Sequence, residues 1–342
     1  MADYLLAVCD SDRVYAEKFM TYANRKRSAP FEVHAFSGAK PLASFLRRHP
    51  ACIVLADAAL ITEEILVLAG PNLIVLDGGD TPELLREDAE GAAAALPHIA
   101  KFQSAPAILR EVMRICSDTE MKSTAAALKQ TASLIGVYAP AGGSGASVFA
   151  ACAAQLLGLS HTTLLVSLEE NAGLSALLKT EFPEDLSNGI YYIRRGDAQF
   201  MFRILPLAQR LGSCDFLPPF RSAADLRSVT RREWEILLSA LKESAGYEAV
   251  VIDFGTLPAA APNLLSLCGR LFIPVRRDVA GAAKLAAFRT ENPLLFAAEG
   301  PARTADLCGL AVPTGTDRFF EQLPYSAFGS AVRSLLEKEA LL

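Results

Sequence analysis

A glycine-rich loop between an apolar run and a helical pattern constrains the fold of this 342-residue chain more than any other feature. Residues 134–138 read LIGVY, residues 139–147 read APAGGSGAS, and residues 148–157 continue as VFAACAAQLL. Short apolar runs that lead into helices are typical of a parallel sheet with helices on its faces. The loop and the first helical turn then direct several backbone N–H groups at one place. The order therefore predicts a strand, a loop that binds phosphate, and a helix.

The first third of the chain has the same strand-and-helix alternation. Helical spacing occurs at 13–26 and 106–117, between and after short apolar runs. Five such runs predict a small, doubly wound α/β domain of the flavodoxin-like type over residues 1–116. The five strand candidates are 4–8, 31–36, 52–56, 72–76 and 98–102.

A polar, alanine-rich stretch at 117–132 contains no strand pattern, and we interpret it as a helical or extended linker. Residues 133–342 then predict a second doubly wound, mainly parallel α/β domain, with a helix at 231–245 among others. Its strand candidates are 134–138, 162–168, 214–218, 249–253, 270–275 and 308–313.

Composition excludes several classes of function. Net charge is −5 and no long basic run occurs, which argues against nucleic acid as a partner. The seven cysteines form no Cys-x-x-Cys pair, as expected of buried free thiols in a reducing compartment. No signal peptide is indicated, and no apolar run reaches the ~18 residues of a spanning helix. We therefore expect a cytoplasmic protein without stable membrane insertion.

Three residues of the first domain resemble the phosphorylation site of response-regulator receivers. Asp10 follows the first strand candidate, Asp57 follows the third, and Lys101 lies on the fifth. The resemblance covers about 115 residues. It implies that Asp10 helps to hold magnesium, that Asp57 accepts a phosphoryl group, and that Lys101 stabilises the phosphoryl oxygens.

The first domain also departs from the receiver pattern. Cys9 stands where receivers carry an acid, Asp77 stands near the place of a hydroxyl residue, and FQS at 102–104 replaces the expected proline. A thiol is a poor ligand for a hard cation. Two interpretations stay open, a response regulator phosphorylated on Asp57 and a pseudo-receiver in which Asp57 only caps a turn.

The glycine-rich loop resembles the deviant Walker A motif of the MinD/ParA family, Lys-Gly-Gly-x-Gly-Lys-Ser/Thr. Both lysine positions are alanine here, Ala141 and Ala146. The resemblance implies that the first lysine would reach across an ATP-bound dimer and that the second would bind the β- and γ-phosphates. It implies a nucleotide site formed by Gly142, Gly143, Ser144, Gly145, Ala146 and Ser147.

Two further segments match landmarks of the same family. The strand candidate 249–253 ends in Asp253, which with Ser147 would hold the Mg²⁺ of an ATP–Mg²⁺ complex. The segment 162–170 lies where the family has an Asp-x-Asp switch and carries Ser167 and Glu169 instead. The resemblance implies that Glu169 positions the attacking water.

Loss of the lysines predicts weak nucleotide binding and still weaker turnover. A charge-assisted hydrogen bond to phosphate contributes roughly 1.5–3 kcal/mol, while the backbone N–H groups and the helix dipole remain. Hydrolysis depends more strongly on cations, because charge develops on the phosphoryl group in the transition state. We expect ATP to bind weakly or not at all, with little hydrolysis, and a homodimer that depends little on ATP.

Nearly the whole chain resembles the TadZ/CpaE family of tight-adherence (type IVc) pilus assembly proteins. The resemblance rests on the order of the two domains and on the stretches 99–105, 215–226 and 247–255. It implies a dimeric localisation scaffold that is recruited to the cell pole and binds other pilus assembly proteins. Two alternatives stay open: an active MinD/ParA-type ATPase switch, against which Ala141 and Ala146 argue, and a response regulator phosphorylated on Asp57.

Two segments outside these motifs carry simpler predictions. Residues 217–237 predict a surface loop that enters a solvated helix, with Trp234 in the core or an interface, and Arg221 or Arg227 within reach of a phosphate or a partner. Residues 331–342 predict a short amphipathic helix that packs on the domain or a partner.

Overall fold

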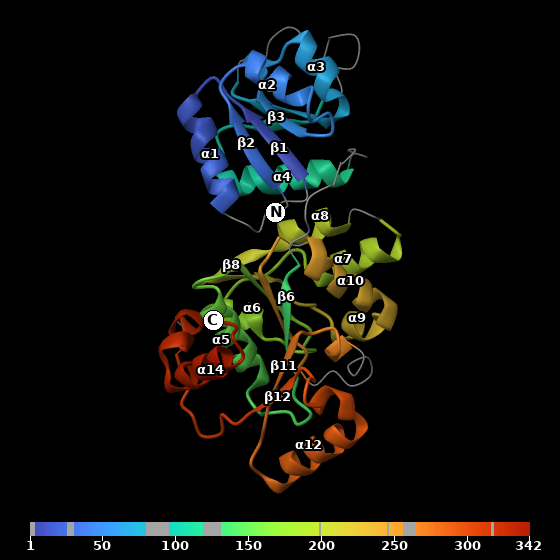
Figure 1. Cartoon of the computed structure of the whole chain (residues 1–342), viewed down its shortest axis with the longest axis vertical. Helices are drawn as coiled ribbons and strands as arrows, with labels where there is room; N and C mark the ends of the chain where they lie inside the picture. The colour runs from blue at the N-terminus through green and yellow to red at the C-terminus, as the bar shows by residue number, and fades with distance from the viewer. Residues whose placement is uncertain are drawn as a thin grey trace. The chain divides into compact units, whose positions relative to one another are not determined.

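The computed structural model describes residues 4–25, 31–79, 96–118, 131–197, 200–244, 246–255, 264–315 and 318–342. The chain divides into two compact units, Met1–Gln130 and Thr131–Leu342 (Figure 1). Most of the expected linker, residues 119–130, lies outside the described residues. Both units are α/β with mainly parallel sheets, which confirms the predicted fold class.

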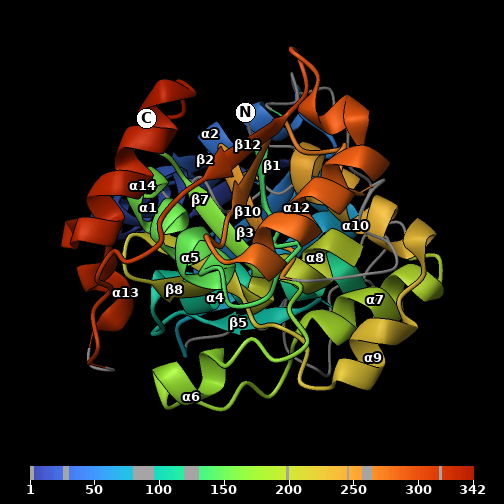
Figure 2. The same cartoon turned by 90° about the horizontal axis from the view of Figure 1, so that it is seen from below.

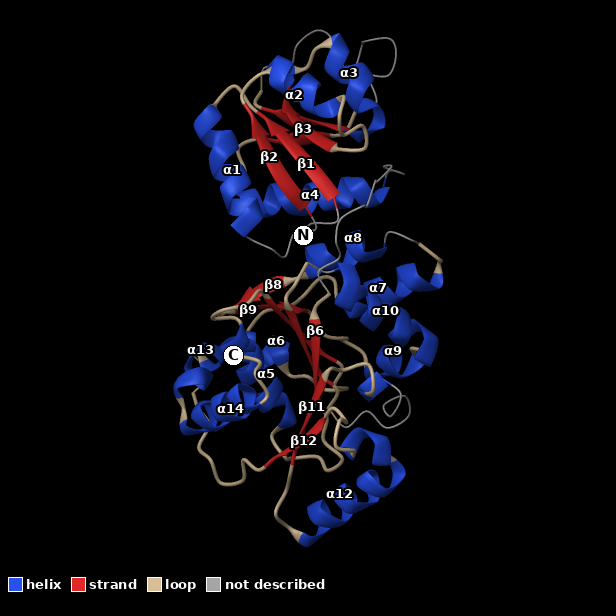
Figure 3. Cartoon of the chain, in the orientation of Figure 1, coloured by secondary structure: helices blue, strands red, loops and turns tan. Residues whose placement is uncertain are grey.

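The first unit is a five-stranded parallel sheet in the order β2-β1-β3-β4-β5. This is the flavodoxin-like strand order. Helix α1 packs beside α4, and α2 packs beside α3, so helices cover both faces (Figure 3). The strands are β1 (Tyr4–Cys9), β2 (Phe31–Phe36), β3 (Ile53–Asp57), β4 (Leu73–Asp77) and β5 (His98–Ala100), and the helices are α1 (Arg13–Arg25), α2 (Ala39–Leu46), α3 (Glu63–Ala69) and α4 (Ala105–Asp118).

The second unit is a seven-stranded sheet in the order β12-β11-β6-β10-β7-β9-β8. All pairs are parallel except β8 with β9. The strands are β6 (Ser133–Val137), β7 (Thr163–Ser167), β8 (Gln209–Leu211), β9 (Cys214–Leu217), β10 (Ala249–Asp253), β11 (Arg270–Pro274) and β12 (Ala302–Ala305).

The last strand corrects one sequence-based prediction. The strand candidate at 308–313 is wrong, because no strand forms there and β12 lies at 302–305. Gly309 has φ 81°, a left-handed conformation that interrupts an extended run. The polar Arg303 and Thr304 conceal β12 in the sequence, because this strand lies at the sheet edge and pairs only with β11 among the described strands. The three-residue strand β8 was also missed.

Helices surround this second sheet, and α5 is the most buried of them. Ten of its 12 residues are buried, which matches its apolar sequence on every side. The helices are α5 (Ala146–Leu157), α6 (Leu174–Leu178), α7 (Leu186–Arg194), α8 (Phe200–Ile204), α9 (Ala223–Ser228), α10 (Arg231–Ser244), α12 (Val279–Glu291), α13 (Phe319–Gln322) and α14 (Ala327–Lys338), with a 3₁₀ turn η6 (Pro293–Phe296) after α12.

The predicted helix at 231–245 corresponds to α10. Its Trp234 is 1% exposed and packs edge-to-face with Phe220, with ring centroids 5.8 Å apart. The prediction that this tryptophan belongs to a packed core is confirmed.

The C-terminal helix α14 packs against α5 (Figure 2). It begins at Ala327, four residues before the predicted start, and it buries Phe328, Gly329, Val332 and Leu336. Packing on its own domain is thereby confirmed. Among the described residues, no helix is long and apolar enough to span a membrane.

Gly329 allows α14 to pack closely on the 3₁₀ turn that precedes it, Leu323–Tyr325, and provides a specific test of this contact. A Cβ at this position would lie 2.7 Å from the carbonyl carbon of Pro324, and backbone cannot move aside as a flexible side chain can. We predict that Gly329→Ala lowers the free energy of unfolding by about 1–3 kcal/mol, measured by urea denaturation of the full chain. The exposed neighbour Ser330 provides the control, since Ser330→Ala should change it by less than about 0.5 kcal/mol. Equal effects of the two substitutions would contradict this docking.

Candidate functional site

Strand register brings the predicted residues of the second unit to one edge of the sheet. Strand β10 lies between β6 and β7, and Asp253 is in register with Val137 on one side and Ser167 on the other. Because parallel strands end at the same edge, the loop after β6, the acid that ends β10 and the segment after β7 meet there. This edge is the candidate nucleotide site.

The glycine-rich loop has the backbone that an anion cradle requires. Gly143 and Gly145 have φ values of 74° and 83°, in the left-handed region that strains other residues. Gly145 is the N-cap of α5 and contributes no side-chain cap. The first N–H groups of α5 therefore remain available for an anion.

The two positions of the missing lysines are packed rather than open. Ala141 is 6% exposed and Ala146 is 8% exposed. Ala146 belongs to the same hydrophobic cluster as Phe328 of α14. Both alanines are buried, and neither supplies positive charge to the loop.

Two carboxyl groups and two hydroxyl groups lie beside the cradle. Ser147 Oγ donates to Glu169 Oε2 at 2.8 Å, and Ser167 Oγ donates to Asp253 Oδ2 at 3.3 Å. The backbone N–H of Gly255 donates to Asp253 Oδ1 at 3.0 Å. Asp253, Ser147 and Glu169 are therefore brought together as the sequence pattern predicts, while their binding roles stay predictions.

Burial raises the pKa of Asp253 to about 6, and the nearby charge of Glu169 adds to the effect. Hydrogen bonds from Gly255, Ser147 and Ser167 act in the opposite direction. A buried carboxyl beside a second carboxyl favours either a proton or a bound cation.

The donor set fits magnesium. Mg²⁺ prefers hard oxygen ligands and usually takes only one or two from protein carboxylates, with the rest from phosphates and water. Ser147 Oγ and the Asp253 carboxylate would hold it, and a bound ion would supply positive charge against the phosphates. No group of three or more His, Cys, Asp or Glu suited to a metal occurs among the described residues, so the phosphates would complete the site.

Arg276 also belongs to this edge, and sequence reasoning missed it. It follows β11, the strand beside β6, and its Nη1 donates to the carbonyl oxygen of Gly142 at 3.0 Å. The available signal was a cation directly after an apolar strand. The two arginines that were predicted instead are occupied elsewhere, with Arg221 on the Phe182 carbonyl and Arg227 on Glu170 at 3.1 Å.

The first unit brings its three predicted residues together as well. Lys101 Nζ lies 2.8 Å from Asp10 Oδ2 and 3.1 Å from Asp57 Oδ2. The Asp10 side chain is fully buried, and Asp57 Oδ1 also accepts from the N–H of Ala59, which caps a 3₁₀ turn. One lysine thus neutralises part of the charge of two acids, which are held as an internal ion-pair cluster.

The departures from a receiver have structural consequences. Burial raises the pKa of the Cys9 thiol to about 11, so this side chain stays protonated and is a poor ligand for a hard cation. Asp77 Oδ1 accepts from the N–H of Gly79 at 2.7 Å and organises the turn after β4.

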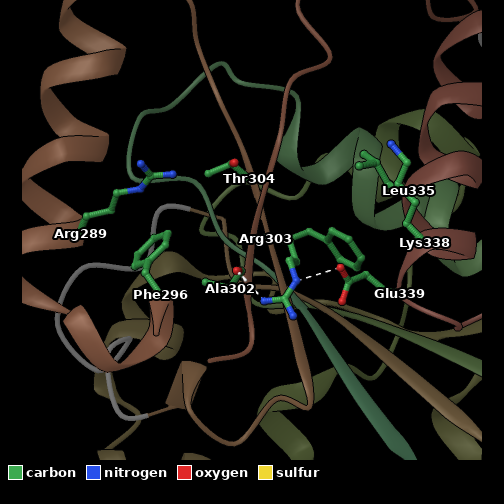
Figure 4. Close-up of a pocket in the computed structure, with 9 residues that line it drawn as sticks. Arg289, Phe296, Ala302, Arg303, Thr304, Leu335, Lys338 and Glu339 are labelled. Carbon is green, nitrogen blue, oxygen red and sulfur yellow. Dashed lines mark hydrogen bonds and ion pairs between the residues drawn. The ribbon is translucent and has the colours of Figure 1, made fainter. Parts of the chain in front are cut away.

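A separate pocket lies along β12, between α12 with η6 and the end of α14 (Figure 4). Arg303 lies in its middle, where Nε donates to Glu339 at 2.8 Å, and the Arg289 guanidinium lies 5.0 Å from the centre of the Phe296 ring. The pocket lining includes no residue of the glycine-rich loop or of the acids beside it.

Comparisons with known proteins find similar folds among solved structures. No family model matches the chain, and no curated protein matches it. Similar solved structures include a ParA family ATPase from Chlorobium tepidum, with 14% identity, 60% of this chain and 97% of that chain covered, and a TM-score of 0.46. A plasmid partition protein from Borrelia burgdorferi has 15% identity, with 61% of this chain and 99% of that chain covered, and a TM-score of 0.45.

Cobyrinic acid a,c-diamide synthase from Mycobacterium smegmatis, solved with ADP and magnesium, has 16% identity. The match covers 61% of this chain and 94% of the synthase chain, with a TM-score of 0.44. At such identities and TM-scores these similarities say nothing about the activity, ligands or partners of this chain.

The raised pKa of Asp253 predicts a pH-dependent stability. The folded state holds a proton more tightly than the unfolded chain between pH 3.8 and about 6, so stability falls as pH rises through this window. Asp253→Asn removes the charge and keeps an oxygen for Gly255. In EDTA at pH 8 it should raise the free energy of unfolding by about 2–3 kcal/mol, and near pH 4 by much less. Exposed Glu181→Gln is the control, and an equal effect of Asp253→Asn at both pH values would contradict the assignment.

The thiol at position 9 of the first unit predicts resistance to phosphorylation. Receivers carry an acid at this place, and the protonated Cys9 thiol cannot replace it in a magnesium site. We expect no increase in mass after incubation of the full chain with acetyl phosphate and Mg²⁺. Addition of one phosphoryl group that Asp57→Asn abolishes would instead support the response-regulator alternative.

Proposed function

We propose that this chain is a nucleotide-binding scaffold with little hydrolytic activity. The second unit would bind ATP with Mg²⁺ in the glycine-rich loop, and the whole chain would serve as a localisation protein in tight-adherence pilus assembly. One observation carries the proposal. The glycine-rich loop keeps the backbone conformation of an anion site, but buried Ala141 and Ala146 occupy the two positions where the family has lysines.

Binding is supported by the backbone groups that remain. Gly143 and Gly145 keep the loop open to an anion, and the N-terminus of α5 favours negative charge. Ser147 and Asp253 lie where they could hold Mg²⁺ against the phosphates. These contributions do not depend on the missing lysines.

Weak hydrolysis is supported by the charge that the loop lacks. The Glu169 carboxylate accepts the Ser147 hydroxyl at 2.8 Å, so one of its oxygens is bonded within the site. Without a lysine at 141 or 146, the charge that develops on a phosphoryl group would lack its usual stabilisation. Occupancy of the site would then stabilise the fold and its surfaces without rapid turnover.

The scaffold role rests on the resemblance to the TadZ/CpaE family, which implies a cytoplasmic homodimer recruited to the cell pole and partners among pilus assembly proteins. The first unit supports this role, because the Cys9 thiol stands in place of a magnesium-binding acid and disfavours a phosphorylation cycle. An unphosphorylated receiver-like unit would act as a docking module.

Calorimetry with ATP and Mg²⁺, paired with a turnover assay on the same sample, tests the proposal. We expect weak binding, negligible turnover, and affinity about tenfold higher or more in Ala146→Lys, which restores a charge-assisted bond to phosphate. Ala146→Met is the control for side-chain bulk without charge. Unchanged affinity in Ala146→Lys would show that the loop is not a phosphate cradle. Wild-type turnover that Glu169→Gln abolishes would favour the active ATPase switch.

A further inference from the structure

We propose that Arg276 provides the positive charge at the phosphate site that Ala141 and Ala146 lack. The inference rests on the proposed nucleotide site and adds to it a residue from outside the loop. Arginine suits this task, since its planar guanidinium carries five N–H donors and stays charged.

The sheet delivers Arg276 to the loop. Strand β11 pairs with β6, and Phe272 lies in register with Val137 at the end of the pair. The chain leaves β11 at Pro274, so Arg276 comes two residues later at the edge where the glycine-rich loop leaves β6. Its Nη1 reaches the Gly142 carbonyl at 3.0 Å and lies 4.0 Å from where a Cβ of Gly143 would stand.

The Arg276 side chain is held in place by the N-terminus of α12. Its Nε donates to Asp278 Oδ2 at 2.6 Å, and Asp278 caps α12 by accepting the N–H of Gly281 at 2.8 Å. A Cβ at Gly281 would lie 2.5 Å from the Cβ of Arg276, so glycine permits this close packing. The arginine is therefore anchored to the start of a helix before any ligand binds, which lowers the entropy cost of using it.

The guanidinium still has donors to offer. Its Nη2 donates to none of the described residues, and the side chain is 41% exposed. A phosphate in the cradle could accept from Nη2, or replace the Gly142 carbonyl as the acceptor of Nη1.

Arg276 is also distinguished from the other cations of this unit. Among the residues that the structure describes, no other Lys or Arg side chain hydrogen-bonds to residues 139–147. The neighbouring Arg277 pairs with Asp306 at 3.1 Å and is 70% exposed. Arg277 therefore provides a matched control of the same type on the same segment.

The test is ATP–Mg²⁺ affinity by calorimetry on the full chain. We expect Arg276→Gln to weaken binding about tenfold or more, Arg276→Lys to lose less, and Arg277→Gln to stay within about twofold of wild type. The salt dependence of the affinity should also be smaller in Arg276→Gln, because a charge has left the site. Thermal unfolding of each variant verifies that it is folded.

A double substitution separates charge from mechanical support of the loop. If Arg276 supplies charge, Arg276→Gln should lose less ATP affinity in the Ala146→Lys background than in the wild type, because the lysine supplies part of the same charge, whereas loss of a brace on Gly142 should weaken binding equally in both backgrounds. An equal loss in both backgrounds, or wild-type affinity in Arg276→Gln, overturns the role of Arg276 and leaves the nucleotide site standing. Absence of ATP binding in the wild type, in Arg276→Lys and in Ala146→Lys refutes the nucleotide site, and the role of Arg276 with it.

Discussion

The parallel pairing of β10 between β6 and β7 is the constraint on which the second unit depends. It places Asp253 level with the ends of both neighbouring strands and so sets the acid beside the glycine-rich loop and the segment that carries Glu169. The strands themselves are almost wholly buried. Their apolar packing holds polar groups at a single edge, where a small ligand could contact all of them.

The two units handle buried carboxylates in opposite ways. In the first unit, Asp10 is fully buried and Lys101 lies within hydrogen-bonding distance. In the second, Asp253 is 3% exposed and is bonded by neutral donors, with Glu169 adding negative charge. A buried charge is stable only when it is paired, protonated or bound to a metal. The first site thus contains a cation of its own, whereas the carboxyl groups of the second favour a cation from outside the protein.

This difference connects the two proposals. A site that keeps its backbone cradle but lacks its lysines can bind nucleotide without hydrolysing it quickly. Binding uses the fixed dipoles of the N–H groups, whereas catalysis also requires cations that stabilise the negative charge developing in the transition state. An arginine from the neighbouring strand would add binding energy without restoring the lysine geometry of an active enzyme. Such a domain is suited to presenting a stable surface, which is what a scaffold requires.

The sequence by itself determined the fold class and much of the site, because short apolar strands and glycine spacing follow local rules. It placed Asp10, Asp57 and Asp253 at the ends of strands, Lys101 on the fifth strand and Ser147 in the glycine-rich loop. It misplaced the last strand, because Arg303 and Thr304 on an edge strand do not show the apolar signal of a central strand.

Only the tertiary structure decided which groups meet. Arg276 lies 134 residues from Gly142 in the chain, and no local pattern links them until β11 pairs with β6. The pairing of Glu169 with Ser147 and the raised pKa of Asp253 likewise arise from strand register and burial. Composition and residue spacing predict the helices and strands, because these follow local rules. The charges around a buried group depend instead on which strands become neighbours in the folded sheet.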